Sequence, residues 1–418
     1  MKTLLILGAG TGGTMVANKM AHHLDPNEWR IVIVDKDETH YYQPGFLFIP
    51  FGIYKPADVI KPKRKLLQSR VDTIFAEIEM IEPDKNRVRL SNKQEISYDF
   101  LVVATGSHIH AEETPGMLDV SWQECIFDFY TIEGATKLGM FLETWNGGRM
   151  VLNIAEMPIK CPVAPLEFLF LADWYFQKRG IRNKVDLVLS TPLPGAFTKP
   201  QASAMLGAIL ENKGISIEPE FTIMEVDNAK QVIRSYDERE VGYDLLVTIP
   251  VNKGADVIGA SGMGDELNFI PTNKNTLQAE KWENVFIIGD AGNVPSSKAG
   301  SVAHFMLDIL VENLLSHMEG QEMKASFDGH ANCFIESGFN KGILIDFNFE
   351  VEPLPGSFPL PGVGPFSLLQ ESFLNHVGKM GFKWIYWNIL LKGLDIPFVE
   401  SHMSMNGKKV LSKSDAQA

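Results

Sequence analysis

Short runs of hydrophobic residues recur along the chain, and most are followed by glycine or by an acidic residue. These runs cover residues 3–7, 31–34, 99–106, 150–154 and 284–290. Runs without polar alternation are typical of strands buried on both faces of a parallel sheet. Helical segments are expected from about Thr14, over 166–176 and over 298–315. The pattern therefore predicts an α/β fold built on parallel sheets.

The first strand runs directly into a glycine-rich segment. Gly8, Gly10 and Gly13 have the G-x-G-x-x-G spacing, in which the glycines allow a tight turn, close approach of a pyrophosphate and close helix–strand packing. The phosphate then lies at a helix N-terminus, where free N–H groups favour it. Asp35 ends the second strand, 22 residues after Gly13, where a carboxylate binds a ribose hydroxyl. The segment predicts a dinucleotide site; the alternative is a glycine-rich turn in an unrelated α/β protein.

The composition is that of an ordinary globular chain. Its 418 residues are 45% hydrophobic and 22% charged, which excludes a disordered chain, a collagen or a coiled coil and predicts two or three domains. The net charge of −14 argues against a nucleic-acid partner. No hydrophobic run reaches the roughly 20 residues of a membrane-spanning helix. The first run is expected to be a buried strand rather than a signal peptide, and no metal site is predicted.

Three cysteines, Cys125, Cys161 and Cys333, are too few for a structural disulfide framework and indicate an intracellular chain or chemistry at particular thiols. Cys161 precedes a predicted helix and follows Lys160, so we expect a lowered thiol pKa. The alternative is that all three are small buried hydrophobic residues. Glu167, six residues after Cys161, is either an acid or base or a helix-surface charge.

The carboxyl-terminal part differs in character. Residues 353–365 contain five prolines and three glycines and are predicted to form a linker or extended arm. Residues 375–413 contain six lysines and two acidic residues, a net charge of +4. Hydrophobic residues recur here at helical spacing, namely Phe366, Leu369, Phe373, Val377, Met380, Trp384, Trp387 and Leu391. The pattern predicts a helix that inserts into one membrane leaflet; a core helix or a homo-oligomer interface is the alternative.

Three motifs occur in a characteristic order: the glycine fingerprint, Ala104-Thr105-Gly106 after a middle strand, and Gly289-Asp290 after a late strand. In this order they resemble the glutathione-reductase-like flavoproteins, which have two Rossmann-like dinucleotide-binding domains. The resemblance implies FAD as cofactor, with Asp290 at its ribityl–phosphate region. The residues expected to bind FAD are Gly8, Gly10, Gly13, Asp35, Thr105, Gly106, Asp290, Lys298 and Lys379, the two lysines by the further resemblance described below.

Relatives that use NAD(P)H carry a second glycine fingerprint near mid-chain. Here the strand over 150–154 stands in the expected place, but no glycine occurs between Gly148 and Gly180. Without glycine the backbone cannot approach a pyrophosphate closely. Another reductant is therefore expected to reduce the flavin, and Cys161 occupies the place of the missing loop.

The missing fingerprint, the thiols and the segment 192–200 resemble the sulfide:quinone oxidoreductases over roughly residues 1–400. The resemblance implies that Cys161 and Cys333 form a redox-active pair beside the flavin and that Cys125 assists or handles sulfur release. The histidines that accompany the third cysteine in some members are absent, because residues 126–139 contain none. Proton transfer by histidine is therefore not expected at that place.

The resemblance also implies roles near the quinone. Lys379, within the segment 376–383, would face the pyrimidine end of the flavin, and Phe334 and Phe382 would enclose the quinone ring. Lys298 would support proton delivery or flavin charge. The alternatives are solvent-exposed positions for the two lysines and ordinary core positions for the two phenylalanines.

The expected protein is a peripheral, monotopic enzyme of the cell membrane, with the cytoplasmic face favoured. It oxidises hydrogen sulfide to sulfur or polysulfide and passes two electrons through FAD to a membrane quinone. The expected domains are an FAD domain (1–110 and 275–330), a second Rossmann-like domain (111–274) and a quinone- and membrane-binding region (331–418). The alternatives are a type II NADH:quinone dehydrogenase, a flavoprotein sulfide dehydrogenase with a cytochrome partner, and a non-enzymatic flavin-binding scaffold.

Overall fold

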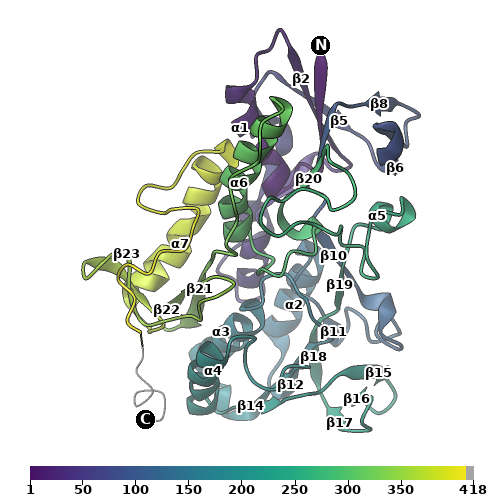
Figure 1. Cartoon of the computed structure of the whole chain (residues 1–418). Helices are drawn as coiled ribbons and strands as arrows, with labels where there is room; N and C mark the ends of the chain where they lie inside the picture. The colour runs from purple at the N-terminus through teal and green to yellow at the C-terminus, as the bar shows by residue number, and fades with distance from the viewer. Residues whose placement is uncertain (411–418) are drawn as a thin grey trace.

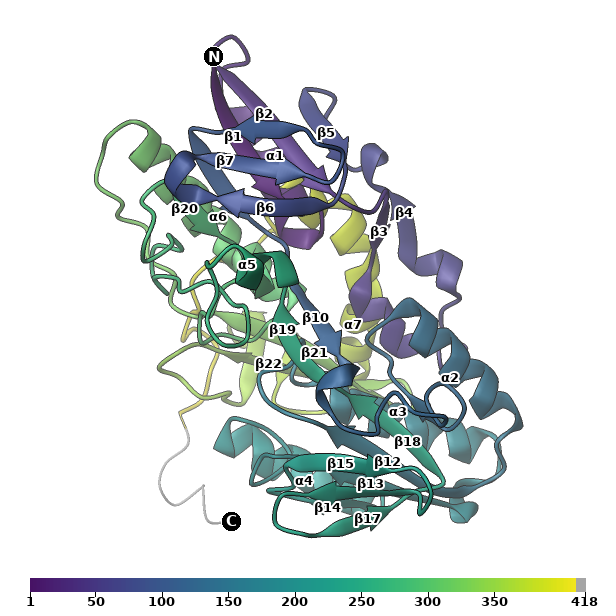
Figure 2. The same ribbon diagram turned by 90° about the vertical axis from the view of Figure 1, so that its right-hand side faces the viewer.

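The computed structural model describes residues 1–410, and one end of it is built on a five-stranded parallel sheet (Figures 1 and 2). The strands lie in the order β20 (Val285–Ile287), β9 (Phe100–Val103), β1 (Lys2–Leu7), β2 (Trp29–Asp35) and β5 (Val71–Phe75). Helices α1 (Thr11–His23) and α6 (Gly300–Met318) pack against each other and against strands of this sheet. Alternate residues of β1 enter two separate cores, Leu4 and Ile6 in one and Leu5 and Leu7 in the other. Burial on both faces explains why the strand is continuously hydrophobic.

The second core of this sheet is closed by an antiparallel three-stranded sheet. Its strands are β6 (Ile78–Glu82), β7 (Arg87–Leu90) and β8 (Glu95–Ser97). Ile81, Val88 and Leu90 pack on the side chains of β1 and β2. A short pair, β3 (Thr39–Tyr41) and β4 (Ile60–Pro62), lies at the edge of the same end.

The opposite end contains a second parallel sheet, as Figure 2 shows. Its strands lie in the order β11 (Ile126–Phe127), β18 (Leu245–Ile249), β12 (Gly148–Ile154), β13 (Val185–Ser190) and β14 (Ile215–Glu218). The helices of this part are α2 (Ile132–Thr144), α3 (Ala164–Lys178) and α4 (Pro200–Asn212). A meander of β15 (Ile223–Asp227), β16 (Val232–Ser235) and β17 (Glu240–Gly242) completes it. The predicted α/β class is confirmed.

The two ends are joined by an antiparallel pair in the middle of the molecule (Figure 2). The pair consists of β10 (Ser107–His110), which leaves the first sheet, and β19 (Val251–Gly254), which leaves the second. The short helix α5 (Asp256–Ala260) follows β19. The chain thus passes from the first sheet to the second after β9, and back towards the first sheet after β18.

The carboxyl-terminal region is a four-stranded sheet covered by one helix. The strands lie in the order β21 (Ala331–Gly338), β22 (Lys341–Phe347), β24 (Gly364–Leu368) and β23 (Gly356–Leu360), and the helix is α7 (Phe373–Asn388). Of the linker or extended arm predicted over 353–365, the linker is wrong, because most of this segment is paired in β23 and the start of β24. Pro359 pairs with Pro365 in this hairpin, and β23 is an edge strand, where proline is tolerated.

The predicted hydrophobic helix is shorter than its sequence pattern. Phe366 lies in β24 and Leu369 precedes α7, so their helical spacing reflects no shared helix. Within α7, Trp384 is 63% exposed, whereas Trp387 is 6% exposed and packs inside the protein. Among residues 1–410, no helix combines the length and the hydrophobicity needed to cross a membrane.

Candidate active site

The glycine segment has the shape that a pyrophosphate requires. Gly8 has a φ of +96°, and a Cβ there would lie 2.4 Å from the carbonyl oxygen of Ala104. A Cβ at Gly13 would lie 1.8 Å from the carbonyl oxygen of Gly8. A Cβ at Gly10 would have no atom within 4 Å, and no side chain caps the N-terminus of α1. Two glycines are therefore required by the fold, while Gly10 faces open space beside free helix N–H groups.

Asp35 is placed at the end of β2 beside this segment. The backbone N–H of Ala9 donates to its Oδ2 at 2.6 Å, and Lys63 Nζ lies 2.8 Å from its Oδ1. The carboxylate is thus tied to the glycine turn, as a ribose-binding acid in this fold would be. Lys63 gives no comparable signal in the sequence, because its position depends on the folding of the 36–66 segment.

The motifs after β9 and β20 lie next to one another. Thr105 has a buried hydroxyl without a hydrogen-bond partner in the described structure. Ser107 donates to Asp290 Oδ2 at 3.3 Å. Lys298 is 7% exposed and donates to the carbonyl oxygens of Asp290 and Gly292 at 3.2 and 2.8 Å. The alternative of a surface lysine is wrong for Lys298, because the side chain is buried. This burial lowers the pKa of Lys298. The open glycine turn and the unpartnered hydroxyl fit a dinucleotide such as FAD.

Cys161 and Cys333 are brought together from distant parts of the chain. Cys161 lies in the loop before α3, with a φ of +48°, and its N–H donates to the carbonyl oxygen of Lys298 at 2.7 Å. Cys333 lies on β21 and is 7% exposed. Both are free thiols; Cys333 belongs to a large hydrophobic core, and Cys161 packs against that core. Lys379, which donates to the carbonyl oxygen of Phe334 next to Cys333, lowers the pKa of both thiols against the effect of burial.

The predicted lowering of the Cys161 pKa is wrong for this thiol. Burial, reinforced by the carboxylate of Glu167, raises the pKa of Cys161 to about 12. Lys379 and the N–H groups that begin α3 act in the opposite direction but are outweighed. Lys160 contributes no pairing, since its Nζ donates to the carbonyl oxygen of Ser107 at 3.1 Å. The start of a helix lowers the pKa of a nearby thiol, but the larger, opposite effect of burial depends on distant segments and cannot be deduced from the local sequence.

Glu167 and Lys379 form a buried ion pair beside the two thiols. Lys379 Nζ lies 2.6 Å from Glu167 Oε1, and the side chains are 10% and 1% exposed respectively. Lys379 also donates to the carbonyl oxygen of Phe334 at 2.9 Å. Burial raises the pKa of Glu167. Burial alone would lower the pKa of Lys379, but the nearby Glu167 and the two thiols outweigh it, so the pKa of Lys379 is raised. The alternatives of surface charges are wrong for both residues.

Two further residues of this cluster were missed by the sequence analysis. The backbone N–H of Glu336 donates to Glu167 Oε1 at 2.7 Å, and Glu336 Oε2 lies 2.8 Å from His376 Nδ1. Glu336 comes from β21 and His376 from α7. Their proximity depends on how α7 packs on the sheet, so no local spacing could have revealed it.

The aromatic residues predicted at the quinone site have different neighbours. The Phe334 ring lies 5.1 Å from that of Phe366, and the Phe382 ring lies 6.5 Å from those of Tyr42 and Tyr386. Both are partly buried and lie close in the sequence or structure to Lys379. Phe334 thus lies beside Lys379, whereas Phe382 packs against Tyr42 and Tyr386, and their shared role at a quinone stays a prediction.

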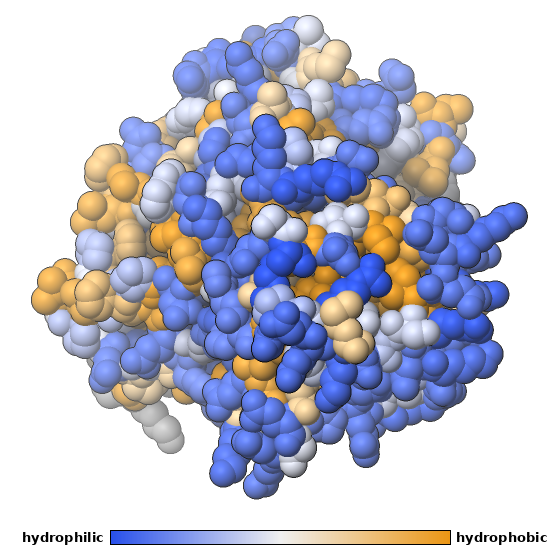
Figure 3. All heavy atoms as spheres, turned by 90° about the horizontal axis from the view of Figure 1, so that it is seen from above, coloured by the Kyte–Doolittle hydropathy of each residue, from blue (hydrophilic) through white to orange (hydrophobic). Residues whose placement is uncertain are grey.

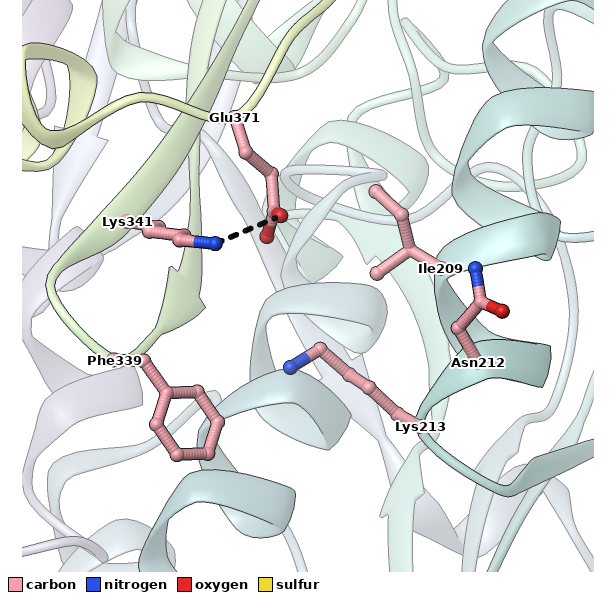
Figure 4. Close-up of a pocket in the computed structure, with 6 residues that line it drawn as sticks. All are labelled: Ile209, Asn212, Lys213, Phe339, Lys341 and Glu371. Atoms are coloured by element: carbon pink, nitrogen blue, oxygen red, sulfur yellow. Dashed lines mark ion pairs between the residues drawn. The ribbon is translucent and has the colours of Figure 1, made fainter.

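Cys125 lies apart from the other two thiols. It precedes β11 and packs in the core beneath the second sheet, near Trp122 and Tyr243. A surface pocket between the end of α4 and the turn from β21 to β22 is lined by Lys213, Phe339 and Glu371 among others (Figure 4). That pocket contains none of the residues predicted for the site.

Comparisons with known proteins identify the fold. Residues 2–139 match the family model described as pyridine nucleotide-disulphide oxidoreductase. The structure superposes on the putidaredoxin reductase of a covalent complex with putidaredoxin with a TM-score of 0.61, at 15% identity and 93% coverage of each chain. The fold is that of the pyridine nucleotide-disulphide oxidoreductases.

The resemblance to sulfide:quinone oxidoreductases is confirmed. The mitochondrial sulfide:quinone oxidoreductase of Dictyostelium discoideum is 28% identical over 93% of this chain and 86% of that protein, and that of Mus musculus is 26% identical with the same coverage. The structure of the Aquifex aeolicus enzyme superposes with a TM-score of 0.79, at 19% identity, covering 93% of this chain and 92% of that one. A type II NADH:quinone oxidoreductase of Staphylococcus haemolyticus matches only 34% of this chain.

Proposed function

We propose that this chain is an FAD-dependent sulfide:quinone oxidoreductase. The observation that carries the proposal is the meeting of Cys161 and Cys333 with the Glu167–Lys379 pair in one buried cluster. The loop that bears Cys161 is hydrogen-bonded to Lys298, which in turn binds the Asp290 segment. The thiols are thereby connected to the expected cofactor site. The matches to sulfide:quinone oxidoreductases over 93% of the chain support the same function.

FAD would be held mainly by the first sheet. Gly8, Gly10 and Gly13 would contact the pyrophosphate, Asp35 the ribose, and Thr105, Gly106 and Asp290 the flavin half, with Lys298 and Lys379 supplying positive charge. When bound, FAD supplies two-electron acceptance from sulfur and two-electron donation to the quinone. The proposed FAD domain comprises 1–110 and 275–330, and the second Rossmann-like domain comprises 111–274.

The sulfur chemistry would occur at the thiol pair in its disulfide form. Hydrosulfide attacks one sulfur; the S–S bond breaks, one cysteine becomes a persulfide and the other leaves as a thiolate. Burial disfavours a free thiolate, so Lys379 would stabilise the charge as it forms. Glu167 would hold Lys379 in place and exchange a proton with the departing sulfur. Cys125, which lies in another core, would act at sulfur release rather than in this exchange.

The quinone- and membrane-binding region would comprise residues 331–418, of which 411–418, including Lys413, lie outside the described residues. Phe334 and Phe382 would enclose the quinone ring. The exposed hydrophobic residues Phe373, Leu374, Val377 and Trp384 lie on α7, and Val363 lies at the tip of the β23–β24 hairpin. Figure 3 shows hydrophobic residues at the left edge of the molecule, the side on which Figure 1 places β23. This surface supports peripheral attachment to the cell membrane, for which we favour the cytoplasmic face; an interface with a second copy is the alternative.

An anaerobic absorption spectrum tests the function. The purified yellow protein should bleach with sulfide, recover its colour with a quinone, and be unaffected by NADH. Bleaching by NADH would favour a type II dehydrogenase, and bleaching by sulfide with recovery only through a cytochrome would favour a sulfide dehydrogenase. A flavin that responds to none of these donors would favour the scaffold.

A further inference from the structure

The buried cluster at the thiols has two carboxyl groups, Glu167 and Glu336, but one lysine, Lys379. Glu167 and Glu336 are 1% and 4% exposed; Lys379 pairs with Glu167, and His376 pairs with Glu336. Burying two carboxylates against one lysine leaves one negative charge unbalanced, which is costly in a low-dielectric interior. A proton held by the remaining pair, Glu336 and His376, restores neutrality. The cluster is therefore built to hold one exchangeable proton.

His376 connects this proton to solvent. Its side chain is 21% exposed, whereas its partner Glu336 is 4% exposed, and the two are joined at 2.8 Å. Behind them, the Glu336 backbone N–H contacts Glu167, which pairs with Lys379. The groups that bear charge or titrate around Glu336 are His376 and Lys379 on α7, Glu167 on α3 and Tyr54 beside η2 (Pro56–Val59). His376, Glu336 and Glu167 thus lie on α7, β21 and α3, and the Glu336 carboxyl is coupled to Glu167 and Lys379 through charge.

The proposed reaction needs such a connection. Oxidation of hydrosulfide to sulfane sulfur releases one proton and two electrons, whereas reduction of a quinone to a quinol takes up two electrons and two protons. Each turnover therefore takes up one net proton. Lys379 lies against Phe48, at 5.8 Å from the ring centroid, and against the backbone of Phe334, so direct access of water to this end of the cluster is restricted.

We propose that the His376–Glu336 pair is the proton inlet of the buried site. His376 takes a proton from solvent and passes it to the Glu336 carboxylate, which supplies the cluster formed by Glu167 and Lys379 as the quinone is reduced. His376 and Glu336 are positioning residues that act through this cluster. The inference rests on the proposed function and deepens it by assigning the route of the consumed proton. It also supplies histidine-dependent proton transfer at a place different from the histidine-free segment after Cys125.

The first test separates the two half-reactions in the FAD-loaded protein. The variants are His376→Ala and Glu336→Gln. The matched control is His110→Ala, because His110, at the end of β10, also pairs with a glutamate, its Nδ1 lying 2.8 Å from the exposed Glu112 Oε1. Rapid mixing measures bleaching by sulfide and then recovery of colour with a water-soluble quinone, between pH 6 and pH 9. Both variants should slow the recovery about tenfold or more, most strongly at high pH, whereas the control should match the wild type.

Two readouts distinguish a proton inlet from a structural role. Added imidazole should restore the recovery rate of His376→Ala but not that of Glu336→Gln. Infrared difference spectra of the holoenzyme should contain a titrating carboxyl band that Glu336→Gln removes. Since burial raises the pKa of Glu336 and His376 opposes this, His376→Ala should shift that titration to higher pH.

The inference would be overturned by an unchanged pH profile together with no rescue by imidazole, or by an equal loss in His110→Ala. If His376→Ala fails to retain FAD, His376→Gln, which keeps a hydrogen-bonding side chain, is measured in its place and the same outcomes decide. Failure of the proposed function looks different, because the wild type itself would then not bleach with sulfide or not recover with quinone.

Discussion

Replacing Lys379 by methionine removes the positive charge from the most buried ion pair of the proposed site. Glu167, 1% exposed, would be left with its carboxylate facing an apolar interior and the N–H of Glu336. Breaking a buried pair by removing one partner costs about 3–5 kcal/mol, because the remaining charge loses its compensation. Lys379→Met should therefore lower the free energy of unfolding by about this amount at pH 8.

The loss should depend on pH in a definite direction. Burial raises the folded-state pKa of Glu167 above its unfolded value, and Lys379 opposes that rise. Without Lys379 the folded-state pKa rises further, so the folded protein binds a proton that the unfolded chain does not. Stability is then fully present below the unfolded pKa and is lost as pH rises through the raised folded pKa. Lys379→Met should be less destabilised at pH 6 than at pH 8.

Urea denaturation of the FAD-loaded protein, followed by flavin release, measures this difference. Lys383→Met is the matched control, because Lys383 lies on the same helix with its Nζ 4.0 Å from the Tyr54 ring centroid and should cost less than about 1 kcal/mol. In the double variant with Glu167→Gln, the two losses should be less than additive. A loss in Lys379→Met no larger than in Lys383→Met, with no dependence on pH, would refute the electrostatic argument.

Three further predictions concern the cofactor, the thiols and the surface. Gly10→Val should fold yet lose FAD, measured by absorbance, because its side chain would occupy the space left for the phosphate. Gly8→Ala should fail to fold, because its Cβ would overlap the carbonyl oxygen of Ala104. Full flavin occupancy in Gly10→Val would contradict the assignment. Cys161→Ser and Cys333→Ser should each keep FAD and lose bleaching by sulfide, while Cys125→Ser should lose less; near-normal turnover of either of the first two would exclude the disulfide mechanism. Trp384→Ser should reduce flotation with anionic liposomes without affecting bleaching of the flavin by sulfide. Trp387→Ser should destabilise the fold, because Trp387 is buried. Unchanged flotation of a folded Trp384→Ser would favour packing against a second copy.

The elements that the sequence predicted well are those whose signal is local. The strand, glycine turn, helix and acid from Leu4 to Asp35 are encoded within some thirty consecutive residues, and the structure places them as expected. The strand and helix around Cys161 are similar, because hydrophobic runs and the prolines at the helix start suffice to locate them.

The features that the sequence could not predict depend on contacts between distant segments. The pKa of Cys161 follows mainly from its burial, which no spacing around Cys161 encodes. Lys379 pairs with Glu167 across 212 positions of sequence, and periodicity alone cannot tell its buried face from the exposed one. The β23–β24 hairpin was missed because a high proline content indicates a linker, whereas at a sheet edge it does not prevent pairing.

Helix α7 presents two different faces, and this limits how the protein can be engineered. Val377 and Trp384 are exposed to solvent. Lys379 pairs with the buried Glu167, and the Tyr386 hydroxyl is hydrogen-bonded to the buried His40 ring. Deleting the helix to obtain a more soluble enzyme would also remove a cation from the thiol cluster and a hydrogen-bonded tyrosine from the core. A variant that stays in solution without detergent should therefore be designed by replacing exposed residues of α7, such as Phe373, Val377 and Trp384, with polar ones. The helix itself should be kept, because it also packs against the thiol cluster.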